Sequence, residues 1–232
     1  MVINSHNTHT IDLWMAWQHD LEPQEDRLSA VLAPEEHQRA AKLHFAEHRN
    51  QYILRRGALR MILAGYLNQP AEDIQFTYNP FGKPEVANSS VSFNTSHSQA
   101  LTMIAVTHGR KLGVDVEYQR SVRNMGGIVQ RFSADIERLV WQVNPTVEQF
   151  YDLWTQKEAY VKAIGRGLSY PLHAFSMITT RGEGWQEHTI PNENKVPEQW
   201  SVYRFAPAPH YLGALVVEGH ADALRMFSFT TV

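Results

Sequence analysis

The chain of 232 residues contains no cysteine. This absence excludes disulfide bonds, thiolate zinc sites, cysteine-bound iron–sulfur clusters and every mechanism that uses a cysteine nucleophile. Chains without disulfides are typical of the cytosol, where thiols are kept reduced. The composition therefore favours a cytoplasmic protein.

An excess of charge of one sign is also missing, since 21 basic and 24 acidic residues give a net charge of -3. No basic field is available to attract nucleic acid. The longest apolar stretches span about ten residues, whereas a transmembrane helix needs about 20. The first residues do not form a basic segment followed by an apolar one, so no secretory signal is expected. We expect a soluble protein that binds neither nucleic acid nor membranes.

Several common functional motifs are absent as well. The chain contains no G-x-G-x-x-G, no Walker-type glycine loop, no G-x-S-x-G and no H-E-x-x-H. These absences argue against the commonest dehydrogenases, nucleotide hydrolases, serine hydrolases and zinc enzymes. Hydrophobic residues make up 43% of the chain, which is enough to form a substantial core.

The hydrophobic pattern predicts the same order of elements twice. In the first half, a strand at 11–18 and a long helix at 34–67 precede strands at 74–78, 91–94 and 101–106. In the second half, a strand at 112–118 and helices at 134–141 and 147–164 precede strands at 175–179, 200–205, 212–217 and 226–230. We predict an α+β fold of two similar lobes, residues 1–111 and 112–232, related by pseudo-twofold symmetry. The active site is expected in the cleft between them.

Two carboxylates stand two residues apart in the apolar segment 113–118. Because side chains alternate along a strand, Asp115 and Glu117 point to one face, and Val114 and Val116 point to the other. Carboxylates this close repel each other, and a hard cation such as Mg²⁺ relieves the repulsion. The alternative is an ordinary strand face in contact with solvent.

The helix expected at 147–164 interrupts its apolar stripe with charged residues. The stripe should continue at position 157 or 158, but these are Lys157 and Glu158, and Lys162 lies one turn beyond. A carboxylate that faces the interior is costly unless it is paired or bound to a metal. The alternative is a surface ion pair between Glu158 and Lys162, four residues apart.

At these residues the chain resembles the Sfp-type 4'-phosphopantetheinyl transferases. The resemblance rests on Gly113-Val-Asp115-Val-Glu117 and on the later Trp154-Thr-Gln-Lys157-Glu158-Ala-Tyr-Val-Lys162-Ala-Ile-Gly165-Arg-Gly167-Leu. Upstream, Phe81-Gly82-Lys83-Pro84 and Phe93-Asn94-Thr95-Ser96-His97-Ser98 are similar to two further elements of the family, in the same order and spacing. The similarity runs from about residue 34 to about residue 171, and the length fits the two-lobed members of the family.

The resemblance implies a reaction and a metal site. The 4'-phosphopantetheine group of coenzyme A, the co-substrate, moves to a serine of an acyl or peptidyl carrier protein, and adenosine 3',5'-bisphosphate is released. By this likeness Asp115, Glu117 and Glu158 hold Mg²⁺ in the second lobe. Glu158 is the expected general base, and Lys162 is expected to contact the phosphate that leaves with the adenosine.

The resemblance also implies a set of coenzyme A contacts, mostly in the first lobe: Arg56, Lys83, Ser96, His97 and Lys162. Taken without the family, Lys83 follows a glycine in a turn between two prolines, a rigid mount for a cation, with a solvated loop lysine as the alternative. His97 reads as a capping or core histidine. The assignment of His97 therefore rests on the resemblance.

Two regions depart from the family pattern or leave alternatives open. Where some relatives carry two lysines at the start of the first helix, this chain has Glu36 and Arg39. We exclude Glu36 as a phosphate contact and keep Arg39 as a candidate. An apolar surface for the carrier protein is expected around Phe132, Leu139 and Trp141, with ordinary core packing as the alternative.

A second interpretation is a catalytically silent regulator that binds coenzyme A or a carrier protein. The acidic residues and Lys162 argue against it, because a pure binder gains nothing from carboxylates that repel each other. The sequence does not identify the carrier protein or its pathway. Because both lobes belong to one chain, no subunit interface is needed to build the cleft, and we expect a monomer.

Overall fold

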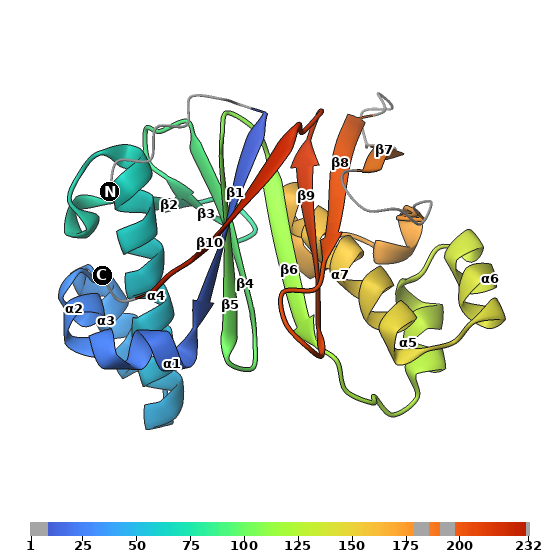
Figure 1. The fold of residues 1–232 in the computed structure, drawn as a ribbon, viewed down its shortest axis with the longest axis horizontal. Helices are drawn as coiled ribbons and strands as arrows, with labels where there is room; N and C mark the ends of the chain where they lie inside the picture. The colour runs from blue at the N-terminus through green and yellow to red at the C-terminus, as the bar shows by residue number, and fades with distance from the viewer. Residues whose placement is uncertain (1–8, 179–185, 191–197, 231–232) are drawn as a thin grey trace.

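Two α+β lobes lie side by side in the computed structural model, which describes residues 9–178, 186–190 and 198–230 (Figure 1). Each lobe contains a four-stranded sheet and one long helix. The predicted two-lobed α+β fold is confirmed. Within the described ranges, none of the helices combines the length and the apolar character needed to cross a bilayer.

The first sheet has the order β10-β1-β5-β4, formed by Ala223–Ser228, Thr10–Trp17, Leu101–His108 and Val91–Ser98. The second has the order β6-β9-β8-β7, formed by Leu112–Tyr118, Tyr211–Glu218, Glu198–Phe205 and Gln186–Ile190. A short hairpin joins β2 (Phe76–Tyr78) to β3 (Pro84–Val86). All neighbouring strands are antiparallel except β10, which runs parallel to β1.

The parallel strand changes the predicted division of the chain. Residues 223–228 were expected in the second lobe, but β10 pairs with β1 of the first sheet, with Thr10 opposite Ala223 and Met15 opposite Ser228. The last strand therefore ties the end of the chain to its beginning. The boundary at residue 111 otherwise stays a prediction.

Helices cover the outer faces of the two sheets. In the first lobe they are α1 (Gln18–Leu21), α2 (Glu25–Ala30), α3 (Pro34–Ala41) and α4 (Ala46–Leu67). In the second they are α5 (Met125–Phe132), α6 (Asp135–Val143) and α7 (Val147–Ala163). Short 3₁₀ turns lie at Glu22–Gln24, Ala71–Asp73, Gly167–Ser169 and Leu172–Ala174.

The single helix predicted at 34–67 is wrong, because the chain breaks between α3 and α4. The reason is a long-range ion pair: Glu36 of α3 binds both Arg56 and Arg60 of α4. In one continuous helix, residues 20 apart would be separated by about 30 Å. The chain therefore turns back at residues 42–45, where Phe45 has an extended backbone.

The strand predicted at 175–179 is also absent over its described part, 175–178; residue 179 lies outside the described ranges. The carbonyl groups of Leu172 and Phe175 instead accept hydrogen bonds from the ammonium of Lys157, at 2.7 and 2.6 Å. A side chain, not a neighbouring strand, satisfies this backbone.

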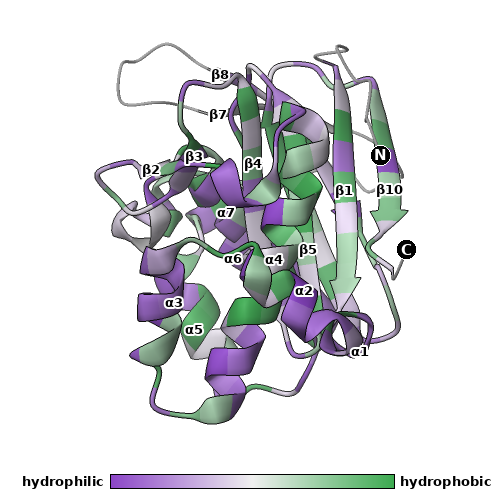
Figure 2. Cartoon of the chain, turned by 90° about the vertical axis from the view of Figure 1, so that its left-hand side faces the viewer, coloured by the Kyte–Doolittle hydropathy of each residue, from purple (hydrophilic) through white to green (hydrophobic). Residues whose placement is uncertain are grey.

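The molecule has four layers, helix–sheet–sheet–helix. The two sheets share a core in which Leu13 and Met103 of the first sheet lie in one cluster with Val114 and Leu215 of the second. On the outer faces, α4 packs against the first sheet and α7 against the second. In Figure 2 hydrophilic residues gather on the small helices α1 and α2, while hydrophobic and hydrophilic bands alternate along β1. This arrangement sets β4 beside β6 at the boundary of the lobes.

Candidate active site

The boundary between the lobes is closed by side chains, not by a continuous sheet. Alternate residues of β4 point their oxygen atoms at the free edge of β6. The side chains of Asn94, Ser96 and Ser98 accept hydrogen bonds from the amides of Val114, Val116 and Tyr118, at 2.9, 3.3 and 3.0 Å. Because both strands repeat every two residues, the three contacts stay in register. We call this set the lobe seam.

Helix α7 approaches β6 very closely on the other side, and Gly113 makes this possible. A Cβ atom at position 113 would lie 2.0 Å from the carbonyl oxygen of Ala159, so no larger residue fits. The glycine of the first motif therefore brings α7, with Glu158 and Lys162, against the strand that carries Asp115 and Glu117.

Asp115 is almost fully buried, at 4% exposure, and only one of its oxygens is satisfied. Oδ1 accepts hydrogen bonds from Ser96 at 2.8 Å and from the Lys162 ammonium at 2.6 Å. Oδ2 is buried and has no partner. Burial raises the pKa of the Asp115 carboxyl, although Lys162 and Ser96 oppose the shift.

Glu117 and Glu158 complete an acidic cluster with Asp115. Burial raises the pKa of Glu117, while a hydrogen bond from Ser98 and the nearby Trp154 side chain oppose the shift. Burial, with the charges of Asp115 and Glu117, raises the pKa of Glu158 to about 7. Oε1 of Glu158 is buried without a partner. The structure thus brings the three predicted metal ligands into one electrostatic cluster with Lys162.

The cluster suits a hard cation by its chemistry. In the described part of the chain, no three carboxylate or imidazole groups stand in a metal-binding arrangement. Lys162 forms its ion pair with Asp115 of β6, and not the surface ion pair with Glu158 that the sequence left open. Two buried carboxylate oxygens nevertheless lack partners, and oxygen donors are those that Mg²⁺ prefers. By donor type, though not by arrangement, these oxygens suit a divalent cation.

A basic cavity of about 880 Å³ lies next to the cluster, within the usual size range of ligand pockets. Its lining includes Arg39, Arg55, Arg56, His48 and His97. Partial burial and the positive charges of Arg55 and Lys162 lower the pKa of His97 to about 4. His97 therefore lines the cavity within electrostatic reach of Lys162, a member of the cluster.

Glu36, excluded above as a phosphate contact, holds two arginines in place. It accepts hydrogen bonds from Arg56 and Arg60, the latter at 2.6 Å. Although burial disfavours its charge, these guanidinium groups and the amide of Ala33 lower the pKa of Glu36. The Arg56 guanidinium also lies 3.9 Å from the centre of the Phe76 ring. Arg56 thus lines the basic cavity in a fixed orientation.

Not all predicted contacts converge on this cavity. Lys83 lies at a separate cavity of about 450 Å³. Its ammonium donates to the carbonyls of Leu112 and Ala163, at 2.9 and 3.1 Å. Ser96 is buried, and its hydroxyl contacts Asp115 and Lys162. Lys83 thus links the two lobes by hydrogen bonds, and Ser96 belongs to the acidic cluster.

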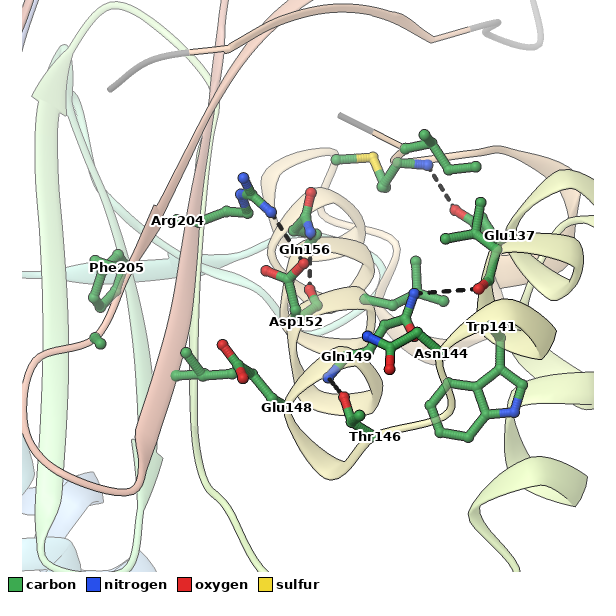
Figure 3. Close-up of a pocket in the computed structure, with 16 residues that line it drawn as sticks. Glu137, Trp141, Asn144, Thr146, Glu148, Gln149, Asp152, Gln156, Arg204 and Phe205 are labelled. Carbon is green, nitrogen blue, oxygen red and sulfur yellow. Dashed lines mark hydrogen bonds and ion pairs between the residues drawn. The ribbon is translucent and has the colours of Figure 1, made fainter. Parts of the chain in front are cut away.

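A third cavity, of about 650 Å³, lies on the other face of α7 and contains none of the predicted site residues (Figure 3). Asp152 forms an ion pair with Arg204 there, at 3.1 Å. Trp141 lines this cavity and, like Phe132, is largely buried in the core, whereas Leu139 is 58% exposed. Core packing therefore accounts for two of the three residues considered for a carrier-protein surface.

Sequence reasoning missed two residues of the cluster, Ser98 and Trp154. Ser98 donates to Oε2 of Glu117 at 2.8 Å, and Trp154 lies near the same carboxylate. The signals were present. Ser98 follows Asn94 and Ser96 at strand spacing, and Trp154 stands one helical turn before Glu158.

Comparison with known proteins agrees with this geometry. A family model described as "4'-phosphopantetheinyl transferase superfamily" matches residues 111–215, and one described as "4'-phosphopantetheinyl transferase, N-terminal" matches residues 14–109. The 4'-phosphopantetheinyl transferase HetI of Nostoc sp. is 33% identical over 216 residues, which cover 90% of this chain and 88% of that protein.

More distant relatives give the same result. The 4'-phosphopantetheinyl transferase Sfp of Bacillus subtilis is 26% identical over 156 residues, 66% of this chain and 68% of that protein. The L-aminoadipate-semialdehyde dehydrogenase-phosphopantetheinyl transferase of Mus musculus is 24% identical over 207 residues, 80% and 67% of the two chains. The chain belongs to the 4'-phosphopantetheinyl transferase superfamily. It is a transferase of the Sfp type, as the motifs predicted, and the silent-regulator interpretation is not favoured.

Proposed function

We propose that this enzyme transfers the 4'-phosphopantetheine group of coenzyme A to a serine of an acyl or peptidyl carrier protein in a Mg²⁺-dependent reaction. One observation carries the proposal: two partnerless, buried carboxylate oxygens, of Asp115 and Glu158, stand beside Lys162 and next to a basic cavity. Carboxylate oxygens attract a divalent cation, and the cavity attracts phosphates. Coenzyme A, a nucleotide with a pyrophosphate and a 3'-phosphate, supplies the partners for both.

The basic cavity would hold the phosphorylated adenosine end of coenzyme A. Arg56 and His97 line it, and Glu36 fixes the orientation of Arg56 before any ligand binds. A preorganised guanidinium binds phosphate without a further loss of side-chain freedom. Lys83 is assigned to coenzyme A by family likeness alone, since its ammonium contacts two backbone carbonyls.

Asp115, Glu117 and Glu158 would hold Mg²⁺. When bound, the ion would neutralise the negative charge of the pyrophosphate during phosphoryl transfer. Lys162 now pairs with Asp115, at 2.6 Å, and would turn to the phosphate that leaves with the adenosine. The Asp115 oxygen that Lys162 occupies would then keep its hydrogen bond from Ser96 and have room for the metal.

The proposed step is an in-line transfer at phosphorus. The serine oxygen of the carrier protein forms a bond to the phosphorus next to pantetheine, and the bond from that phosphorus to the bridging oxygen breaks. The bridging oxygen leaves with adenosine 3',5'-bisphosphate, and the Glu158 carboxylate accepts the serine proton. The products are the modified carrier protein and the nucleotide.

We further propose that the enzyme is a cytoplasmic monomer. The absence of cysteine favours a reducing compartment. Both lobes that flank the cluster come from one chain, and β10 returns to the first sheet, so no second subunit is required to complete the seam.

Intact-mass spectrometry tests the function. An apo acyl carrier protein and an apo peptidyl carrier domain are each incubated with the enzyme and coenzyme A, with Mg²⁺ or with chelator. We expect a mass gain of one phosphopantetheine group on at least one carrier, and no gain with chelator. Binding of coenzyme A without any gain on either carrier would favour the silent regulator, and no binding at all would overturn the proposal.

A further inference from the structure

Ser98 is the last residue of β4, and its hydroxyl joins the two lobes at the acidic cluster. The oxygen accepts the amide of Tyr118 at 3.0 Å, and the proton is donated to Oε2 of Glu117 at 2.8 Å. A hydroxyl has a single proton, so this donation is committed to the carboxylate. Ser98 belongs to the first lobe and Glu117 to the second, so the contact exists only when the seam is closed.

The three members of the seam differ in what they touch. Asn94 caps the amide of Val114 at 2.9 Å, and no hydrogen bond from it to a carboxylate is present in the described part of the chain. Ser96 contacts Asp115, but Lys162 binds the same oxygen of Asp115, at 2.6 Å. Ser98 is thus the seam residue whose hydroxyl holds a carboxylate oxygen to which, among the described residues, no ammonium donates a hydrogen bond.

Glu117 needs such a contact more than its neighbours do. Asp115 is fixed by burial and by its ion pair with Lys162. Glu117 has a longer side chain and is only partly buried, so more rotamers are open to it. The hydrogen bond from Ser98 holds Oε2 in place, and Trp154 of α7 approaches the same carboxylate from the second lobe.

We propose that Ser98 is a positioning residue for metal binding: it orients Glu117 across the lobe seam so that this carboxylate faces the cation. The inference rests on the proposed function, since it takes Glu117 as a metal ligand. Residues that orient metal ligands change metal affinity by about 10- to 100-fold when they are removed. Ser98 acts through Glu117 and does not itself touch the reacting atoms.

Three variants separate positioning from mere stabilisation of the seam. Ser98→Ala removes the hydroxyl, Ser98→Thr keeps it, and Asn94→Ala breaks a seam contact that involves no carboxylate. For each, metal binding to the intact enzyme is measured by tryptophan-sensitised Tb³⁺ luminescence with Mg²⁺ as competitor, because Trp154 lies near Glu117. The Mg²⁺ concentration for half-maximal transfer, the kcat at saturating Mg²⁺ and coenzyme A binding in chelator are measured in parallel.

We expect Ser98→Ala to weaken Mg²⁺ competition and to raise the half-saturating Mg²⁺ concentration by roughly tenfold or more. Its kcat at saturating Mg²⁺ should stay within about threefold of wild type, and Ser98→Thr should restore the affinity. Asn94→Ala should leave Mg²⁺ affinity unchanged. Equal Mg²⁺ affinity in Ser98→Ala and wild type would overturn the proposal, as would an equal loss in Asn94→Ala. If wild type itself binds neither Mg²⁺ nor coenzyme A, the proposed function fails first, and the two failures are distinguishable.

Discussion

Two neighbouring residues of α7, Lys157 and Glu158, have opposite surroundings. Lys157 is completely buried, yet its ammonium is fully satisfied. It forms an ion pair with Glu137 at 2.8 Å and donates hydrogen bonds to two backbone carbonyls. Glu158 carries an oxygen without a partner, and burial, together with two like charges, raises its pKa. One face of the helix carries a satisfied charge and the other an unsatisfied one.

The difference separates structural from functional charge. Glu137 also accepts the amides of Ala134 and Met177, each at 2.7 Å, so the pair with Lys157 forms a closed network that needs nothing from outside. The acidic cluster of Asp115, Glu117 and Glu158 is open, since part of the free-energy cost of burying these carboxylates is not compensated, and an added proton or cation would recover it. Burial alone therefore does not mark a site; an unsatisfied hydrogen-bonding capacity does.

The largest expected effect is at the open cluster. Glu158→Gln keeps the size of the side chain and removes one charge, so we expect kcat/KM to fall by about a thousandfold. The unfolding free energy without ligands should not fall, because the substitution relieves repulsion from Asp115 and Glu117. Transfer rates and urea unfolding measure the two effects. Glu148→Gln, at an exposed position of the same helix, is the control and should leave the rate unchanged. A loss of stability with retained activity would mean that Glu158 is a structural and not a functional charge.

The closed network should behave in the opposite way. Lys157→Met leaves the buried carboxylate of Glu137 without its counter-charge, and we expect the unfolding free energy to drop by about 3–5 kcal/mol. Replacing both partners, Glu137→Leu with Lys157→Met, should recover much of that loss. Urea denaturation at neutral pH measures both. A drop below about 1 kcal/mol in the single variant would mean that the pair is not structural.

How far the sequence predicts this arrangement depends on how far apart in the chain the contacting residues lie. The acidic cluster was predictable because its residues lie in two local patterns, a strand and a helix, that carry family motifs. The ion pair of Lys157 was not predictable, because its partner Glu137 lies in another helix. The break between α3 and α4 likewise depends on Glu36 reaching Arg56.

The sheet topology was hidden for the same reason. β10 pairs with β1, at the opposite end of the chain, and no local periodicity reports a partner at that distance. The contact of Ser98 with Glu117 crosses the lobe seam and becomes visible only when β4 and β6 are side by side. Local patterns predicted the elements, and long-range polar contacts decided how they are joined.

The smallest expected effect concerns Lys83, a partly buried cation whose surroundings are intermediate between the closed network of Lys157 and the open acidic cluster. It has two carbonyl partners, while the charge of Glu85 acts on it without a hydrogen bond, and burial lowers its pKa to about 8 from 10.5. Between these pH values the unfolded chain binds more protons at this group than the folded protein, so raising the pH stabilises the fold. We expect wild type to gain about 1 kcal/mol of unfolding free energy relative to Lys83→Met over this window. Denaturant unfolding of both proteins at about pH 8 and about pH 10 measures the difference. If the unfolding free energies of wild type and Lys83→Met change in parallel with pH, two carbonyls satisfy an ammonium as fully as a carboxylate does. A charge could then be closed without a counter-ion.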